Sequence, residues 1–269
     1  MAPALMPEIL YGRNPVLEAL RAGRRVRRLL VVPGLSPDGR LEEIIDRAAT
    51  VGVAIEATPR GRLNDVAHTE HHQGIAAYFD GRQLDNRDAL RQLMESQNPS
   101  WPPAFVCLDE VQDPQNLGSL ARSAEVLGVT ALILPRHRTA PPSAAAAKAS
   151  AGAIEHLRLV RVVNLVQTLR ELGDLGVARI GLDASGDRRC DQVDLRQAVA
   201  LVVGAEGEGL RSLTRRHCDA LVSIPMGGRV QSLNASVAGS LLMYEMARQR
   251  GFAYPSSALA SRNRAGASI

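Results

Sequence analysis

The apolar stretch AFVCL at residues 104–108 is followed by the polar stretch DEVQDPQNLGSLAR at residues 109–122. The apolar run predicts a buried strand, and Asp113 and Pro114 predict the helix after it, as N-cap and first helical residue. Strand and helix continue to alternate to about Arg250. Continuous apolar strands are typical of a parallel sheet covered by helices on both faces, so residues 104–250 predict an α/β domain.

A smaller α/β domain is predicted ahead of it, at residues 1–84. Asn14 and Pro15 indicate its first helix, with the asparagine as N-cap. Residues 41–49 have the apolar spacing of an amphipathic helix. Strands are expected at 28–32, 53–55 and 75–79.

Two further segments complete the predicted organisation. Residues 85–103 are expected to link the domains, through a helix at about 88–96 and then three prolines between Asn98 and Pro103. The end of the chain, residues 251–269, is rich in serine, alanine and arginine without periodicity. We expect this tail to be disordered.

Composition limits the class of protein. The chain has 269 residues and a formal net charge of +4, and Lys148 is its single lysine beside many arginines. Guanidinium groups suit phosphate, so a nucleic acid is a reasonable partner, although a GC-rich coding bias also explains the arginines. Aromatic residues make up only 3%, which argues against a base-stacking platform.

The sequence gives no indication of a metal site or a membrane segment. The three cysteines have no metal-ligand spacing, and the histidines at 68, 71 and 72 are better explained as a polar loop before a strand. No secretory signal or membrane-length apolar run is present. We therefore expect a cytoplasmic protein that binds no metal.

Three polar clusters follow apolar strands of the larger domain, where ligands bind in open α/β sheets. The first contains Asn116, Gly118 and Arg122; a capped amphipathic helix explains most of it, but not a glycine in the helix interior. The second, at 204–210, has three glycines in six residues and fits neither the dinucleotide pattern nor a P-loop, so an oxidoreductase is disfavoured. The third, at 224–236, holds more polar residues than one helix cap requires.

The order and spacing of these clusters resemble the SpoU/TrmH family of RNA ribose 2′-O-methyltransferases. The matching patterns are Asn-x-Gly-x-x-x-Arg, Gly-x-Glu-x-x-Gly-Leu, and Ile-Pro-Met followed by Ser-Leu-Asn-x-Ser. In the smaller domain, the segments beginning at Tyr11 and at His72 resemble the substrate-binding domain of a subgroup that methylates a guanosine in large-subunit rRNA.

The resemblance implies a fold, a cofactor and a set of site residues. The larger domain would carry the trefoil knot of this fold (SPOUT), form a homodimer and bind S-adenosylmethionine; the smaller one would be an L30e-like RNA-binding domain. The cofactor would be lined by Gly204, Ile224, Met226 and Leu233. The matching functional positions are Asn116, Arg122, Glu206, Ser232 and Asn234.

The resemblance also implies roles for these residues. A guanidinium stays protonated, so Arg122 is better suited to holding the target phosphate than to acting as the base. Asn116, Ser232 and Asn234 would orient the ribose and the helix ends, and Glu206 would support its loop or balance Arg122. Three alternatives remain open: another rRNA site, including one that confers antibiotic resistance; a tRNA substrate; and a catalytically silent RNA-binding homologue.

Overall fold

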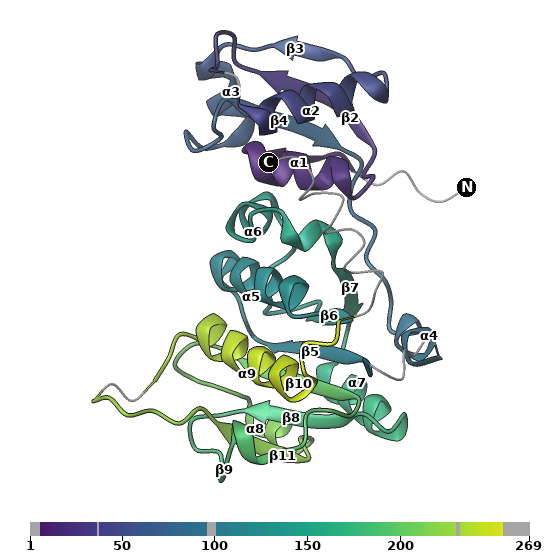
Figure 1. The fold of residues 1–269 in the computed structure, drawn as a ribbon, viewed down its shortest axis with the longest axis vertical. Helices are drawn as coiled ribbons and strands as arrows, with labels where there is room; N and C mark the ends of the chain where they lie inside the picture. The colour runs from purple at the N-terminus through teal and green to yellow at the C-terminus, as the bar shows by residue number, and fades with distance from the viewer. Residues whose placement is uncertain (1–5, 37, 96–100, 230–231, 255–269) are drawn as a thin grey trace. The chain divides into compact units, whose positions relative to one another are not determined.

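The computed structural model describes residues 6–36, 38–95, 101–229 and 232–254 (Figure 1). They form two compact units. The first contains the described residues up to Gln83 together with the segment 141–156, and the second contains residues 84–140 and those from 157 onward. The segment 141–156 therefore lies in the first unit although its neighbours on both sides in the sequence lie in the second.

The second unit is built on a sheet of seven parallel strands. Its strand order is β7-β6-β5-β10-β8-β11-β9. The strands β5 and β10 are buried along their whole length, as their apolar sequences predict. The bounds are β5 Ala104–Asp109, β6 Ala131–Pro135, β7 Arg158–Val162, β8 Ala178–Leu182, β9 Arg188–Arg189, β10 Val199–Gly204 and β11 Ala220–Ser223.

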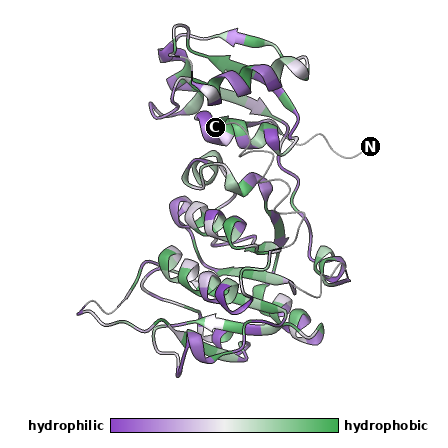
Figure 2. Ribbon diagram, viewed as in Figure 1, coloured by the Kyte–Doolittle hydropathy of each residue, from purple (hydrophilic) through white to green (hydrophobic). Residues whose placement is uncertain are grey.

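Helices cover both faces of this sheet, which explains why its strands lack apolar–polar alternation. Phe105 and Cys107 of β5 pack with α4 (Ala89–Glu95) and α7 (Leu165–Asp174). On the other face, α5 (Pro114–Val126) packs beside α9 (Ala235–Gln249), and α9 also contacts β10 (Figure 1). In Figure 2 the central strands of this sheet are coloured as hydrophobic, whereas the helices carry both hydrophobic and hydrophilic residues. The short helices of the unit are α8 (Ser212–Arg215) and η2 (Cys190–Gln192).

Small residues allow α5 and α9 to approach closely. A Cβ added to Gly239 of α9 would lie 2.6 Å from Leu120 Cδ2 of α5, so any larger side chain would push the helices apart. One turn along, the hydroxyl groups of Ser123 and Ser240 are hydrogen-bonded at 2.7 Å. This contact links the last turn of α5 to α9 near its middle.

The first unit has a mixed sheet of four strands in the order β1-β4-β2-β3. Its strands are β1 Glu8–Tyr11, β2 Val26–Val31, β3 Ile55–Ala57 and β4 Ile75–Phe79. Its helices are α1 Arg13–Arg21, α2 Gly39–Thr50, α3 Arg60–Ala67, α6 Ala144–Ala149 and the 3₁₀ helix η1 Ala153–His156.

A buried ion-pair cluster holds the segment 141–156 in the first unit. The side chain of Glu155 is fully buried and forms ion pairs with Arg24 and Arg82. Arg24 also binds Glu8 at 2.7 Å, and Arg82 donates to the carbonyl of Ile154 at 2.9 Å. Removing one partner of such a cluster leaves a buried charge uncompensated, so these contacts specify where the segment packs.

The structure corrects three details of the predicted organisation. The N-cap of α1 is Gly12, not Asn14, because the side chain of Gln73 accepts the first free backbone N–H of that helix. The helix within the predicted linker of residues 85–103 is α4, which contributes three buried side chains to the core of the second unit. Residues 251–254 also pack, with the ring of Tyr254 centred 4.9 Å from that of Trp101; the rest of the predicted tail, 255–269, lies outside the described residues.

Candidate active site

The candidate site lies where the strand order of the large sheet reverses. From β5 the chain proceeds to β6 and β7 on one side, whereas β10 and β8 lie on the other. The last residues of the two central strands, Asp109 of β5 and Gly204 of β10, are direct neighbours in the parallel register. Ligands bind at such a point, beyond the carboxyl ends of the strands.

Three predicted residues from distant parts of the sequence meet at this edge. The Nδ2 of Asn234 donates to Asn116 Oδ1 at 2.9 Å and to Glu206 Oε2 at 3.0 Å. Asn116 Nδ2 completes the triangle with a longer bond of 3.3 Å to the same carboxylate oxygen. The cluster thus joins α5, the loop after β10 and the start of α9, and Asn116 within it is only 8% exposed.

Helix capping fixes the orientation of Asn234. Its Oδ1 accepts hydrogen bonds from the backbone N–H groups of Ser236 and Val237, at 2.9 and 3.3 Å, and from the Ser236 hydroxyl at 2.6 Å. An amide whose oxygen faces these donors must direct its NH₂ group the other way. The cap of α9 therefore presents two donors to Asn116 and Glu206.

The loop that carries Glu206 is closed by a backbone contact. Ala205 and Gly209 pair through two hydrogen bonds of 3.1 and 3.0 Å. A Cβ added to Gly204 would lie 2.2 Å from the carbonyl oxygen of Gly209, so this turn requires glycine at the end of β10. Glu206 is held at the exposed tip of the closed loop.

A buried carboxylate fastens the other end of the same loop. The side chain of Asp109 is fully buried and accepts from the backbone N–H of Arg211 at 2.9 Å and from its Nε at 2.7 Å. Arg211 and Arg138 both approach the carboxylate of Glu110, at 3.4 and 3.0 Å. Sequence reasoning missed Asp109 and Arg211; the available signal was a charged residue that ends an otherwise apolar strand.

The next strand also ends in a buried acid. Asp183 follows β8, accepts from the backbone and hydroxyl of Ser185, and pairs with Arg215. Burial alone would raise the pKa of Asp183, but the hydrogen bonds from Ser185 and the charge of Arg215 hold it below its usual value. The edge of the sheet thus combines these paired charges with the cluster of Asn116, Glu206 and Asn234, called here the amide–carboxylate cluster.

Among the described residues, no hydrogen bond or ion pair joins the other predicted residues to this cluster. Arg122 is exposed on α5, and within the described part of the chain it forms no hydrogen bond or ion pair. Ser232 is exposed, and it is Ser236, not Ser232, that binds Asn234. Three predicted cofactor residues have accessible apolar side chains in the segments after β11 and before α9: Ile224, Met226 and Leu233.

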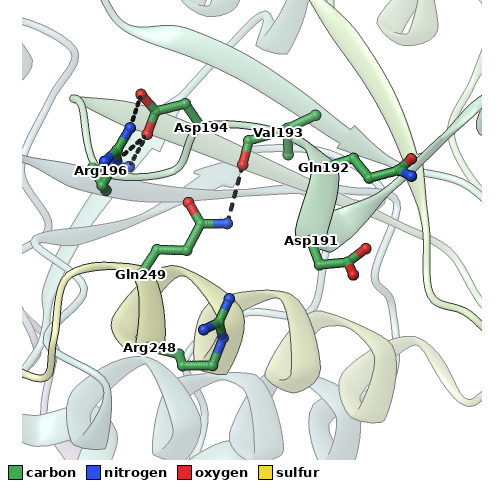
Figure 3. Close-up of a pocket in the computed structure, with 7 residues that line it drawn as sticks. All are labelled: Asp191, Gln192, Val193, Asp194, Arg196, Arg248 and Gln249. Carbon is green, nitrogen blue, oxygen red and sulfur yellow. Dashed lines mark hydrogen bonds and ion pairs between the residues drawn. The ribbon is translucent and has the colours of Figure 1, made fainter.

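A depression elsewhere in the second unit is not a comparable site. Figure 3 shows it between α9 and the segment 191–196. Its charged side chains are neutralised by close neighbours: Asp194 pairs with Arg196, and Arg248 with Glu245. It is lined by Asp191, Gln192, Val193, Asp194, Arg196, Arg248 and Gln249.

Within the ranges given above, no group of three or more His, Cys, Asp or Glu side chains is arranged to hold a metal ion. The helices described are too short or too polar to cross a bilayer. His72 is fully buried with its Nδ1 bound to the backbone N–H of Gly74 and its Nε2 to Asn64, which is a structural role.

Comparison with known proteins identifies the class of this site. A profile of the SpoU rRNA methylase family matches residues 103–244, and a profile for RNA 2′-O ribose methyltransferase substrate binding matches residues 9–84. Both describe enzymes that methylate RNA. The chain belongs to the SpoU rRNA methylase family, whose methyl donor is S-adenosylmethionine.

Individual relatives agree with this assignment along most of the chain. An uncharacterized tRNA/rRNA methyltransferase of Mycolicibacterium vanbaalenii is 43% identical over 90% of this chain and 77% of its own. The putative TrmH family tRNA/rRNA methyltransferase YacO of Bacillus subtilis is 37% identical over 90% and 96%. The structure of the SpoU methyltransferase AviRb from Streptomyces viridochromogenes, in complex with AdoMet, is similar with a TM-score of 0.75 and 26% identity over 92% and 91%.

Proposed function

We propose that this enzyme transfers a methyl group from S-adenosylmethionine to the ribose 2′-hydroxyl of a guanosine in large-subunit rRNA. The observation that carries the proposal is the cluster of Asn116, Glu206 and Asn234 at the reversal point of the sheet. The match of residues 9–84 to an RNA 2′-O ribose methyltransferase substrate-binding profile supports an RNA substrate. The resemblance of this unit to the substrate-binding domain of a subgroup that methylates large-subunit rRNA favours rRNA over tRNA. An enzyme with this substrate works in the cytoplasm, where ribosomes are assembled.

The residues at the sheet edge fit the proposed cofactor. The glycines at 204 and 209 allow the loop after β10 to close tightly on its own backbone, which would hold the backbone groups of the loop in place for a ligand. Met226 and Leu233 are 44% and 38% exposed, an unfavourable state for apolar side chains that a flat aromatic ligand would relieve. Gly204, Ile224, Met226 and Leu233 would hold the cofactor, and the similar structure of AviRb is itself a complex with AdoMet.

The chemistry assigns different tasks to the polar residues. When bound, S-adenosylmethionine supplies an electrophilic methyl group on a positively charged sulfur, and neutralisation of charge during transfer favours a site shielded from water. Asn116 and Asn234 orient the loop of Glu206, and Ser232 would reach the ribose. Arg122 would hold the target phosphate bidentately, while a phosphate oxygen or a water accepts the hydroxyl proton.

We further propose that the enzyme is a homodimer and that its C-terminal segment is threaded as a trefoil knot. On α9, Val237, Leu241 and Tyr244 follow one another at spacings of four and three residues and so share one helix face, and each is more than 40% exposed. A second copy of the chain would cover this stripe. Leu241→Glu would then yield a monomer in light scattering after size exclusion; an unchanged dimer would exclude α9 from the interface.

The test of the function is transfer of labelled methyl from S-adenosylmethionine to unmodified large-subunit rRNA, with the methylated ribose mapped by its resistance to alkaline cleavage. One protected guanosine ribose is the expected result. Incorporation into tRNA instead would keep the reaction and overturn the substrate, and no incorporation into either RNA would favour a silent RNA-binding protein.

A variant tests the role of Arg122 separately. Arg122→Ala should abolish transfer while leaving the affinity for S-adenosylmethionine nearly unchanged, because the side chain is proposed to hold RNA, not the cofactor. A loss of cofactor binding in calorimetry would exclude this role.

A further inference from the structure

The single lysine of the sequence occupies an unusual place in the first unit. Lys148 lies on α6, in the segment 141–156, and its side chain is partly buried. All other positively charged side chains of the protein are arginines. A chain that uses arginine almost everywhere carries a compact ammonium group at this one position.

The ammonium group rests against the turn between β1 and α1. Lys148 Nζ donates to Gln73 Oε1 at 2.8 Å, and the same oxygen accepts from the backbone N–H of Arg13 at 3.0 Å. A Cβ added to Gly12 would lie only 2.6 Å from Nζ. The longer, planar guanidinium of arginine could not occupy this space without displacing the turn.

The loop that presents Gln73 is rigidly held. The buried ring of His72 accepts from the backbone N–H of Gly74 through Nδ1, at 2.9 Å, and so donates through Nε2 to Asn64 Oδ1 at 2.7 Å. Burial lowers the pKa of His72, and the positive charges of Arg60 and Lys148 lower it further. The ring is therefore neutral and contributes no charge to balance Lys148.

Lys148 differs from the other buried or half-buried cations of its unit in having no counter-charge. Arg24 and Arg82 share Glu155, and Arg13 pairs with Asp38. Among the residues that the structure describes, Lys148 has one partner, an amide oxygen, and burial lowers its pKa. The remaining N–H donors of this cation face no anion of the described chain, so they are available to a ligand that carries negative charge.

We propose that Lys148, with Gln73 and the turn at residues 11–13, is a binding site for a backbone phosphate of the RNA substrate. The inference rests on the proposed function, since it takes RNA as the ligand. Lys148 has two further N–H donors to offer a phosphate oxygen, while Gln73 fixes the position of its nitrogen. Arg60 adds positive charge near the same loop.

The absence of other lysines permits a direct test on the unmodified protein. An amine-reactive ester can acylate only Lys148 and the α-amino group of the chain. The rRNA fragment that the enzyme methylates should slow acylation of Lys148 severalfold, measured by mass spectrometry, without slowing that of the α-amino group to the same degree. Equal rates for Lys148 with and without RNA would overturn the proposal.

A matched pair of variants gives the second test. Lys148→Met should weaken RNA binding on the order of tenfold and reduce the slope of log Kd against log salt by roughly 0.7–0.9, as for one lost phosphate contact. Arg47→Met removes from the same unit a positive charge that is already paired with Glu43. This control should change neither the RNA affinity nor the salt slope. Equal RNA affinity for wild type and Lys148→Met would refute the site.

These outcomes separate this inference from the proposed function. A wild-type enzyme that neither binds nor methylates RNA would refute the function itself. A wild-type enzyme that methylates RNA while Lys148 is neither protected nor required would refute the phosphate site alone.

Discussion

Substitution of Gly204 by alanine tests whether the closed loop after β10 makes the cofactor site. The added methyl group would lie 2.2 and 2.3 Å from the carbonyl oxygen and carbon of Gly209 and 2.6 Å from the backbone nitrogen of Leu210. Ordinary contacts of a Cβ are longer than 3.4 Å. All three atoms belong to the backbone, so no side chain can rotate to relieve the overlap, and the loop must open.

The cost of opening follows from the contacts that close the loop. The two hydrogen bonds between Ala205 and Gly209 contribute about 1 kcal/mol each. Displacing Arg211 as well would leave the carboxylate of Asp109 buried without its donors, at a further cost of roughly 3 kcal/mol. If only the two hydrogen bonds between Ala205 and Gly209 are lost, the cost of about 2 kcal/mol corresponds to roughly a 30-fold loss of affinity for a ligand that needs the closed loop.

The assay is calorimetric titration with S-adenosylmethionine, and the chain provides a matched control. Gly207, in the same loop, has φ +82° but no atom within 4 Å of an added Cβ. Gly207→Ala should therefore cost only about 1 kcal/mol of backbone strain, or roughly fivefold in affinity. If Gly204→Ala binds the cofactor as well as Gly207→Ala does, the closed turn does not make the site.

Three further predictions concern the active-site cluster, an acid and the thiols. Asn234→Asp keeps the cap of α9 but places a carboxylate against Glu206. We expect kcat to fall roughly 30- to 100-fold, for a loss of about 2–3 kcal/mol, while the circular dichroism spectrum stays unchanged. Near-normal turnover would contradict a catalytic role of the cluster. The folded-state pKa of Asp183 is lowered, so this residue stabilises the fold above the usual pKa of 3.8, and the stabilisation is lost as pH falls through the lower folded-state pKa. The melting temperature of Asp183→Asn should therefore depend less on pH below about 4 than that of the wild type. An identical pH dependence would exclude this role. Burial raises the pKa of Cys218 to about 12 and that of Cys107 well above its usual value. Iodoacetamide at pH 8 should therefore label both thiols in urea and hardly label them in the native protein. Fast labelling of the native protein would show that the thiols are accessible.

Much of the larger domain was predictable because its signals are local. Apolar runs such as 104–108 are typical of strands in a sheet with both faces covered, and the structure confirms a parallel sheet. Asp113 and Pro114 begin α5 as predicted, with Asp113 Oδ1 accepting from Gln115. A helix start depends on three or four consecutive residues, which a sequence displays directly.

The features that the sequence did not reveal depend on contacts between distant residues. Nothing near Glu155 in the sequence indicates that Arg24 and Arg82 bury it. The same applies to Asp109 and Arg211, since a buried acid looks like a surface acid until its partner is known. The residues of the amide–carboxylate cluster came from the family resemblance, and their catalytic roles remain predictions.

The first unit is built from two separate stretches of the chain, which limits how it can be transferred to another protein. Domain shuffling and chimera design usually cut at a linker, here before residue 84, and carry the preceding residues to a new host. Such a cut would transplant two arginines whose shared carboxylate stays behind at Glu155. The segment of chain that must be transferred is therefore discontinuous. A graft that omits residues 141–156 would lack the helices α6 and η1, and with them Lys148.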